Sequence, residues 1–154
     1  KIISDGGIKF SGDIIKALAA GADAIMMGSI FAGTDESPGK KFKYKKKIYK
    51  SYRGMGSIGA MSEGSSNRYF QKNYKNKSKF VPEGVEARVL YKGSVNEILY
   101  QLQGGLRSSM GYIGAKMIKK IQKQARFVKI TKAGFYESMV HSVEMTKEVT
   151  NYKL

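Results

Sequence analysis

The sequence predicts an α/β fold that begins with a parallel strand–helix–strand unit in residues 1–33. The first segment, Lys1–Ser4, is short and apolar, and residues 22–27 form a second apolar segment. Between them, apolar side chains recur at helical spacing at Ile14, Ile15, Leu18 and Ala19. Because parallel strands require a crossover of about a dozen residues, these segments predict a parallel βαβ unit.

The helix of this unit has recognisable ends. Ser11 is expected to be its N-cap, and Asp13 lies in the first turn, where the helix dipole favours a negative charge. Gly21 is expected at the C′ position, where a left-handed backbone favours glycine. The first strand leads into a tight turn, Asp5-Gly6-Gly7, and the second strand ends at Gly28-Ser29.

Two strands alone do not complete a parallel sheet, which needs neighbouring strands and cover on both faces. The chain also begins without Met, inside the first predicted strand. We therefore expect the remaining strands of this sheet to lie outside the 154 residues.

Residues 34–50 contain a basic stretch, and residues 51–93 show little periodicity of either kind. A basic stretch, Lys40–Lys47, leads into residues 51–93, which are rich in Gly, Ser and Asn. A loop of this length inside a compact domain is usually functional or mobile. The sequence therefore predicts one long irregular loop here.

Residues 94–125 are expected to be helical, starting at a capping box formed by Ser94 and Glu97. Glycines at 104, 105 and 111 weaken that helix and predict a kink or a break. A second, amphipathic helix is expected over residues 115–125, with Ile118 and Ile121 on one side. Residues 127–131 then predict a short strand, and the tail from residue 133 has no assignment.

Composition limits the classes of function. The chain has no Cys, so it forms no disulfide, and a thiolate nucleophile would come from elsewhere. Its net charge of +16 suggests an anionic partner: nucleic acid, a membrane surface or a phosphorylated ligand. No apolar run approaches the roughly 18 residues of a membrane span. One histidine, His141, cannot make a metal site by itself.

The two glycine turns are the first candidate site. The carboxyl ends of parallel strands meet at one edge, where main-chain amides can bind phosphate. Gly6, Gly7 and Gly28 would leave those amides accessible, Ser29 would add a hydroxyl, and Asp5 could accept hydrogen bonds from a ribose. The alternative is an ordinary strand-to-helix turn.

A second candidate is the glycine loop after Tyr52-Arg53, in which Gly54, Gly56 and Gly59 spell G-x-G-x-x-G. We reject a dinucleotide-binding fingerprint, because the preceding segment is polar and no helix is expected to follow. A flexible loop along a ligand, or a generic glycine loop, explains the pattern better. Farther along, Arg68-Tyr69 and Glu83 could contact a ligand or be solvated. Residue chemistry alone does not make Arg68 catalytic, because Arg is a poor base at neutral pH.

Taken together, these motifs resemble inosine 5′-monophosphate (IMP) dehydrogenase. The stretches that carry the resemblance occur in the family's order and span the chain: residues 3–8, 21–24, 27–29, 52–57, 68–70, 81–85 and 104–111. The resemblance implies the C-terminal part of a catalytic (β/α)₈ barrel. Residues 1–33 would be its last two strands, 51–93 the active-site loop and mobile flap, 94–125 helices, and 126–154 a tail.

The resemblance also implies roles for individual residues. Asp5 would bind the ribose hydroxyls, and Gly54, Met55, Gly56 and Glu83 would line the purine ring. The 5′-phosphate would be bound by Gly7, Gly28, Ser29 and Tyr52, with Gly6 and Arg53 as further substrate contacts.

In the family, a Cys attacks the purine, hydride passes to NAD, and a flap closes so that water hydrolyses the intermediate. Arg68 with Tyr69 would activate that water. The Cys would lie in the N-terminal remainder of the enzyme, so we expect these 154 residues alone to be inactive. The family further implies a cytoplasmic homotetramer with K⁺ bound between subunits, here through Glu137, Ser138 and Met139.

Two alternatives remain. GMP reductase shares the barrel and the phosphate loops but does not need the hydrolytic flap, so Gly54–Ser57 and Arg68-Tyr69 favour the dehydrogenase. A basic nucleic-acid-binding module would explain the net charge and the aromatic residues within the Lys40–Lys50 stretch, although nucleic-acid affinity could also be incidental.

Overall fold

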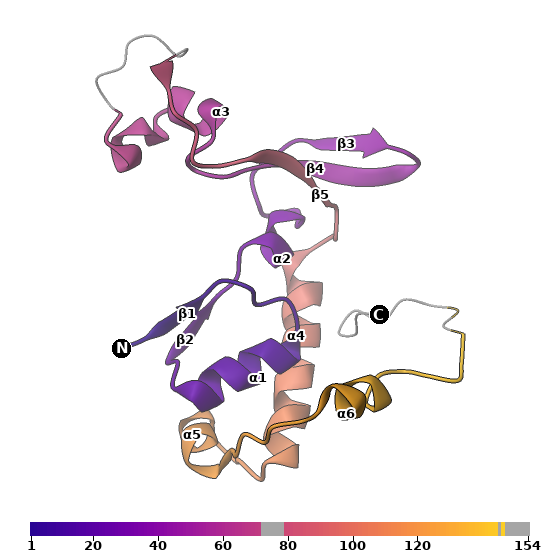
Figure 1. Ribbon diagram of the computed structural model, residues 1–154. Helices are drawn as coiled ribbons and strands as arrows, with labels where there is room; N and C mark the ends of the chain where they lie inside the picture. Colours follow the sequence, from indigo (N-terminus) through magenta and orange to yellow (C-terminus); the bar gives the residue numbers. More distant parts are fainter. Residues whose placement is uncertain (72–78, 145, 147–154) are drawn as a thin grey trace. The chain divides into compact units, whose positions relative to one another are not determined.

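The computed structural model describes residues 1–71, 79–144 and 146 of the chain (Figure 1). These residues form two compact units. The first unit contains Lys1–Gly28 and the chain from Asn96 onward, and the second contains Ser29–Val95. The fold is mixed α/β, and the strands of the described residues do not close a barrel.

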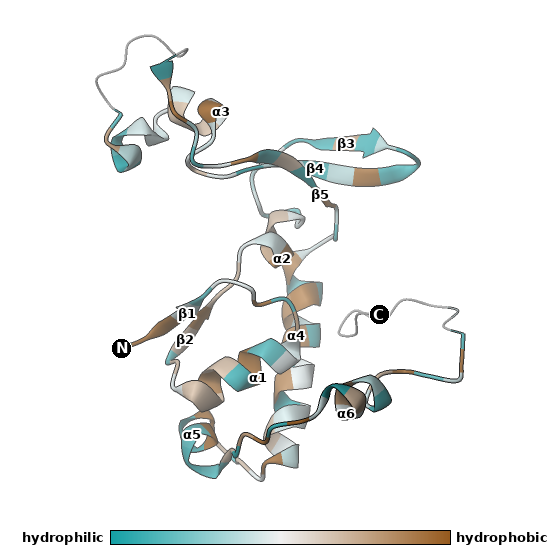
Figure 2. Cartoon of the chain, in the orientation of Figure 1, coloured by the Kyte–Doolittle hydropathy of each residue, from teal (hydrophilic) through white to brown (hydrophobic). Residues whose placement is uncertain are grey.

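The parallel βαβ unit predicted for residues 1–33 is confirmed. Strand β1 (Ile3–Asp5), helix α1 (Ser11–Ala20) and strand β2 (Ala24–Met26) follow in order, and the two strands pair in parallel. In Figure 2 the chain is apolar where it enters β1, and the last two residues of the strand, Ser4 and Asp5, are polar. Ile3 is nevertheless 58% exposed and Met26 50% exposed. Since parallel strands are normally covered on both faces, these surfaces are suited to further packing.

Helix α1 does not begin as predicted. Ser11 is its first helical residue and Phe10 is the N-cap. The free amides of Lys9 and Phe10 donate to the Asp13 carboxylate, at 3.0 Å each. A carboxylate in the first turn therefore replaces the expected hydroxyl cap. At the other end, Gly21 has φ 123° and caps the helix as predicted.

Buried apolar side chains hold the first unit together. Ile14 and Leu18 of α1 are buried, and α1 packs against helix α5 (Ile121–Gln124), in which Ile121 is fully buried. The expected second helix over residues 115–125 is shorter than predicted, because a 3₁₀ turn, η3 (Ile118–Lys120), precedes α5. Ile118 is 55% exposed and does not share the buried side of Ile121.

Helix α4 (Val95–Tyr112) runs without interruption past Gly104, Gly105 and Gly111, so the predicted break is wrong. Its first half is anchored by Ile98 and Leu102, which are both buried. The hydroxyl groups of Ser108 and Ser109 donate to carbonyls four residues earlier in the same helix. Tertiary anchoring outweighs the low helix propensity of glycine here.

The strand predicted for residues 127–131 is also absent, since no secondary structure is assigned there. Thr131 instead caps helix α6 (Lys132–Glu137), and its side chain accepts a 3.0 Å hydrogen bond from the Gly134 amide. The β-branched residues before it predicted a strand, but the described chain offers them no pairing partner.

The second unit contains a sheet that the sequence did not predict. Strands β3 (Lys41–Tyr44), β4 (Lys47–Arg53) and β5 (Glu86–Leu90) form an antiparallel sheet in the order β3-β4-β5. Lys45 and Lys46 make the tight turn of the β3–β4 hairpin, with φ of 44° and 64°. The described residues of this unit also include the short helices α2 (Ser29–Ala32) and α3 (Ile58–Ser62) and the 3₁₀ helix η1 (Ser65–Tyr69). Residues 51–93 are therefore not one irregular loop.

One face of this sheet is covered by residues 33–37. Lys50 of β4 is only 2% exposed, and its ammonium group donates to the carbonyls of Thr34 and Ser37. Gly33 passes so close to β5 that an added Cβ would lie 2.2 Å from the Leu90 carbonyl oxygen. The covering segment is thus fixed by main-chain contacts and a buried cation.

Two carboxylates of this segment, from Asp35 and Glu36, bind other parts of the unit. Asp35 accepts hydrogen bonds from the Lys41 ammonium and the Tyr91 hydroxyl, which lower the pKa of the Asp35 carboxyl. Glu36 accepts from the Val95 amide at 2.8 Å and from the Ser94 hydroxyl at 2.9 Å. Glu36 therefore caps the first turn of α4 from outside the helix.

This cap predicts a pH-dependent contribution to stability. The Val95 amide lowers the pKa of Glu36 below its unfolded value of about 4.3. A depressed folded pKa gives stability that is present above about pH 4.3 and is lost as pH falls through the folded value. Glu36→Gln should lower the melting temperature at neutral pH and flatten its decline between about pH 5 and about pH 3. Identical pH profiles for Glu36→Gln and wild type would contradict this role.

Candidate functional site

The carboxyl ends of β1 and β2 bring the first candidate residues together. Asp5 pairs with Met26, so Gly7 and Gly28 each lie two residues beyond the last paired position. Gly6 and Gly7 have φ of 98° and 74°, a conformation that favours glycine. A Cβ at Gly6, Gly7 or Gly28 would meet no atom within 4 Å. The main chain at this edge is therefore open to an approaching ligand.

Asp5 adds a carboxylate to the same edge. It is the last residue of β1 and is exposed. Within the described residues, the Asp5 side chain has neither a hydrogen bond nor an ion pair. Ser29, which follows Gly28, is the exposed first residue of α2. The edge can thus offer main-chain amides and an acceptor for hydroxyl groups.

The second unit contains an open pocket beside β4, with a volume of about 1300 Å³. Three basic side chains line it, from Lys40, Arg53 and Arg68, together with two acidic ones, from Glu63 and Glu86. Tyr52, Met55 and Asn67 are among its other lining residues. This arrangement can accept an anionic ligand that also has an apolar or planar part.

Two backbone segments lie against each other at the edge of this pocket. The Gly54 amide donates to the Val85 carbonyl at 2.8 Å, and the amides of Glu83 and Gly84 donate to the Gly56 carbonyl. A Cβ on Gly84 would lie 2.8 Å from the Ser57 nitrogen. The close contact requires glycine and brings the exposed Glu83 beside the loop that carries Met55.

The reasons given for rejecting a dinucleotide fingerprint are wrong in part. Strand β4 does precede Gly54, and helix α3 does follow, capped by the Ser57 hydroxyl. However, β4 is antiparallel to both of its neighbours, and α3 has five residues. The Gly59 amide at the start of α3 already donates to Glu86. These residues therefore do not form a parallel dinucleotide-binding unit.

Arg68 and Tyr69 lie in η1, next to the same glycine loop. Arg68 is exposed and lines the pocket. The Tyr69 ring covers Gly56, since an added Cβ there would lie 3.0 Å from two ring carbons. Arg53, on the pocket wall, forms an ion pair with Glu63 that raises the pKa of the guanidinium. The structure thus brings Arg68, Tyr69 and the glycine loop into one neighbourhood.

A pair of hydrogen bonds follows η1 that sequence reasoning missed. The Gln71 side chain donates to the Val81 carbonyl at 3.0 Å and accepts from the Val81 amide at 2.9 Å. Gln71 is buried at 8% exposure. Its isolated position in a polar stretch gave no signal for this contact. Part of the flap predicted over residues 51–93, namely residues 72–78, lies outside the described residues.

The residues predicted to bind K⁺ are at the end of α6 in the first unit. Glu137 ends the helix and Ser138 is its C-cap, followed by Met139. The Glu137 carboxylate lies 3.4 Å from His141. Across the described ranges, no group of three or more His, Cys, Asp or Glu side chains could hold a metal ion. Nor is any described helix both long and apolar enough to cross a membrane.

Comparison with known families defines the class of protein. The model of the IMP dehydrogenase / GMP reductase domain matches residues 1–141. The chain therefore belongs to this family. The resemblance inferred from the ordered motifs is confirmed at this level.

Individual relatives point to one branch of the family. The chain is 61% identical over 153 residues to inosine-5′-monophosphate dehydrogenase of Chlorobaculum parvum, and 58% identical to that of Aquifex aeolicus over 152. The Streptococcus pyogenes enzyme of the same name is 54% identical over 153 residues. Each match covers 98–99% of this chain but only 30–31% of the relative.

Proposed function

We propose that this chain provides the nucleotide site and the hydrolytic residues of an enzyme that oxidises IMP to XMP with NAD. The observation that carries the proposal is the edge formed by β1 and β2. There, Gly7 and Gly28 follow paired strands and have open space around them. Family membership and the names of the relatives supply the substrate.

The proposed binding of IMP follows from donor and acceptor chemistry. Main-chain amides at Gly6, Gly7 and Gly28, with the hydroxyls of Ser29 and Tyr52, would donate to the 5′-phosphate. Asp5 can only accept when ionised, so it suits the two ribose hydroxyls. An exposed carboxylate without a partner loses no existing contact when it binds.

The purine would lie along the glycine loop. Gly54, Met55 and Gly56 present a main chain with one apolar side chain, and the main chain of Glu83 is fixed nearby by the hydrogen bond that its amide donates to the Gly56 carbonyl. Arg53 would approach the substrate from the pocket wall. Its ion pair with Glu63 restrains the guanidinium and so limits its reach.

Arg68 and Tyr69 are proposed to act on the water that hydrolyses the covalent intermediate, which a Cys of the N-terminal remainder would form. An Arg accepts a proton only if its site is closed to bulk water and strongly perturbed. The Tyr69 ring lies against Gly56 of the glycine loop, and its hydroxyl can relay a proton.

NAD would accept the hydride when bound. The described residues do not fit a dinucleotide-binding unit, so no step through NAD is derived from them. K⁺ would be bound by main-chain carbonyls of Glu137, Ser138 and Met139, since the end of a helix leaves carbonyls without intrahelical donors. A homotetramer would complete that site from a second subunit, and GMP reductase remains the alternative activity.

The test uses the protein expressed from its complete coding sequence. We expect NADH from IMP and NAD and no oxidation of NADPH with GMP, whereas the reverse would identify a GMP reductase. Asp5→Asn should raise the KM for IMP about 10- to 100-fold, because it removes a charged acceptor. Asp23→Asn, at the opposite end of the same strand pair, is the matched control and should leave this KM unchanged. An unchanged KM in Asp5→Asn would overturn the assignment of the edge.

A further inference from the structure

We propose that Glu86 is a positioning residue for nucleotide binding, which holds the glycine loop, residues 54–57, in the shape that the purine requires. This inference rests on the proposed function and extends it to a residue outside the set assigned to IMP. Glu86 is the first residue of β5 and lines the pocket of the second unit. It contacts the chain on both sides of the glycine loop.

The start of the loop is fixed to Glu86 by the sheet. Arg53, the last residue of β4, is the register partner of Glu86. Next to this pair, the Gly54 amide donates to the Val85 carbonyl at 2.8 Å. Cross-strand partners share a face, so the two side chains lie on one side of the sheet. The pKa of the Arg53 guanidinium is raised, chiefly by the Glu63 carboxylate and also by that of Glu86.

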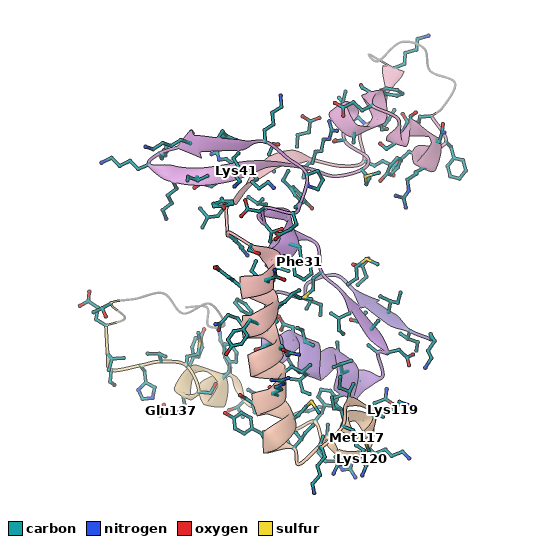
Figure 3. All side chains as sticks on the ribbon, turned by 180° about the vertical axis from the view of Figure 1, so that it is seen from behind. Phe31, Lys41, Met117, Lys119, Lys120 and Glu137 are labelled. Carbon is teal, nitrogen blue, oxygen red and sulfur yellow. The ribbon has the colours of Figure 1, made fainter. Side chains whose placement is uncertain are left out.

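The end of the loop is fixed by the Glu86 side chain. Its carboxylate accepts a 2.8 Å hydrogen bond from the Gly59 amide in the first turn of α3. The Ser57 cap of α3 is local, whereas Glu86 is 27 residues from Gly59 in the sequence. Figure 3 shows α3, located by its label in Figure 1, beyond the end of the sheet that is away from the β3–β4 turn, with Lys41 labelled on β3. The carboxylate therefore ties α3 to the sheet.

The contact between Glu86 and α3 requires a glycine at position 59. A Cβ there would lie 2.6 Å from Glu86 Oε1 and 3.4 Å from Arg53 Nη1. Since Oε1 ends a flexible side chain, alanine would fit only if the carboxylate moved away from the amide. The backbone of Gly59 does not itself need glycine, because its φ is not positive. Glycine at this position therefore serves the contact with Glu86.

Between its two fixed ends, the loop presents the groups assigned to the purine. The carbonyl of the buried Gly56 accepts from the amides of Glu83 and Gly84, and the Met55 carbonyl accepts from the Ser65 hydroxyl. A loop that is already ordered loses less conformational freedom when a ligand binds. Without the tie between α3 and the sheet, IMP would have to order Met55 and Glu83 as it binds.

The experiment is a double-mutant cycle in the complete protein, with KM and kcat for IMP measured for wild type, Glu86→Ala, Gly59→Ala and the double variant. Glu86→Ala should raise KM about tenfold, because an exposed, charge-assisted hydrogen bond is lost. kcat should change less than about twofold, since the contact is present before and during the reaction. The dissociation constant of IMP, measured by calorimetry without NAD, should rise with KM.

Gly59→Ala should raise KM by a similar factor, although alanine favours a helix more than glycine does. The double variant should also show a rise of about tenfold rather than about hundredfold, because both changes break the same contact. Gly59→Ala keeps the carboxylate and so provides the same test if Glu86→Ala does not fold.

Two controls complete the cycle. Glu86→Gln keeps an acceptor for the Gly59 amide and should bring KM to within about threefold of wild type. Gly12→Ala matches Gly59→Ala, because Gly12 is also the second residue of its helix and a Cβ there would meet no atom within 4 Å. It should leave KM unchanged. Independently of activity, hydrogen exchange at the Gly59 amide should be faster in Glu86→Ala than in wild type.

Several results would overturn the proposal. These are an unchanged KM in Glu86→Ala or Gly59→Ala, or a rise of about hundredfold in the double variant. A Glu86→Gln variant as impaired as Glu86→Ala would assign the effect to the charge beside Arg53 instead. A loss of kcat as large as the rise in KM would assign Glu86 to the fold as a whole. Failure of the proposed function is distinct, because it would appear in the wild type as the absence of NADH from IMP.

Discussion

Replacing Arg68 with alanine is expected to lower kcat for IMP oxidation by about 100- to 10,000-fold, the range for losing a positioned proton acceptor. Arg68 lines the pocket beside the glycine loop, and its partner Tyr69 lies against Gly56. Because the proposed role is confined to hydrolysis, the first turnover should still release NADH. Rapid-mixing measurements should therefore show a burst followed by a slow steady state.

Two further variants define what this result means. Arg68→Lys should recover part of the activity as pH rises, because an ammonium group loses its proton more readily than a guanidinium. Arg126→Ala is the matched control, since Arg126 is exposed and, among the residues that the structure describes, donates to nearby main-chain carbonyls alone. Loss of the burst together with the steady state would move Arg68 from hydrolysis to substrate binding or folding.

Replacing Lys50 with methionine is expected to lower the free energy of unfolding by about 3 kcal/mol. Methionine fills a similar volume but cannot donate, so the carbonyls of Thr34 and Ser37 lose their charged donor in a buried place. Chemical denaturation of the complete protein measures the loss. Hydrogen exchange should show that amides near residues 34–39 open more often.

Lys41→Met provides the comparison, because Lys41 lies on the neighbouring strand, is exposed and pairs with the exposed Asp35. Surface ion pairs contribute little, so this change should cost clearly less stability than Lys50→Met. A larger cost for Lys41→Met, or unchanged exchange near residues 34–39 in Lys50→Met, would show that the buried cation does not hold this segment.

The part of the fold that could be predicted is the part with local patterns. Ile14 and Leu18 recur at helical spacing, and Gly21 ends the helix where a positive φ is needed. The parallel pairing of β1 and β2 followed from the length of the crossover. Each of these features depends on residues close together in the sequence.

The antiparallel sheet could not be predicted because its strands carry lysine on both faces. Lys50 is buried and Lys47 is exposed, although both occur in one basic stretch. What makes burial of Lys50 possible is a pair of carbonyls 13 and 16 residues away. No pattern of polar and apolar residues contains that information. The cap that Glu36 provides for α4 could not be predicted either, because its partners are 58 and 59 residues away in the sequence.

The candidate site shows a similar division. Ordered motifs identified the residues of the glycine loop and of η1, and the structure places Gly56 and Tyr69 in contact. The residues that support them were not identified, because the contacts of Gln71 and Glu86 join distant segments. The assigned roles at Asp5, Glu83 and Met139 stay predictions until the complete protein is assayed.

Because two hydrogen bonds join Gln71 to Val81, the shape of the pocket should not depend on the number of residues between these two positions. Because Gln71 and Val81 are hydrogen-bonded to each other, residues added between them should be accommodated at little cost. The free-energy cost of closing a loop rises slowly, by about 0.6 kcal/mol for each doubling of the loop length. Insertions between Gln71 and Val81 should therefore leave the positions of Arg68 and Tyr69 unchanged.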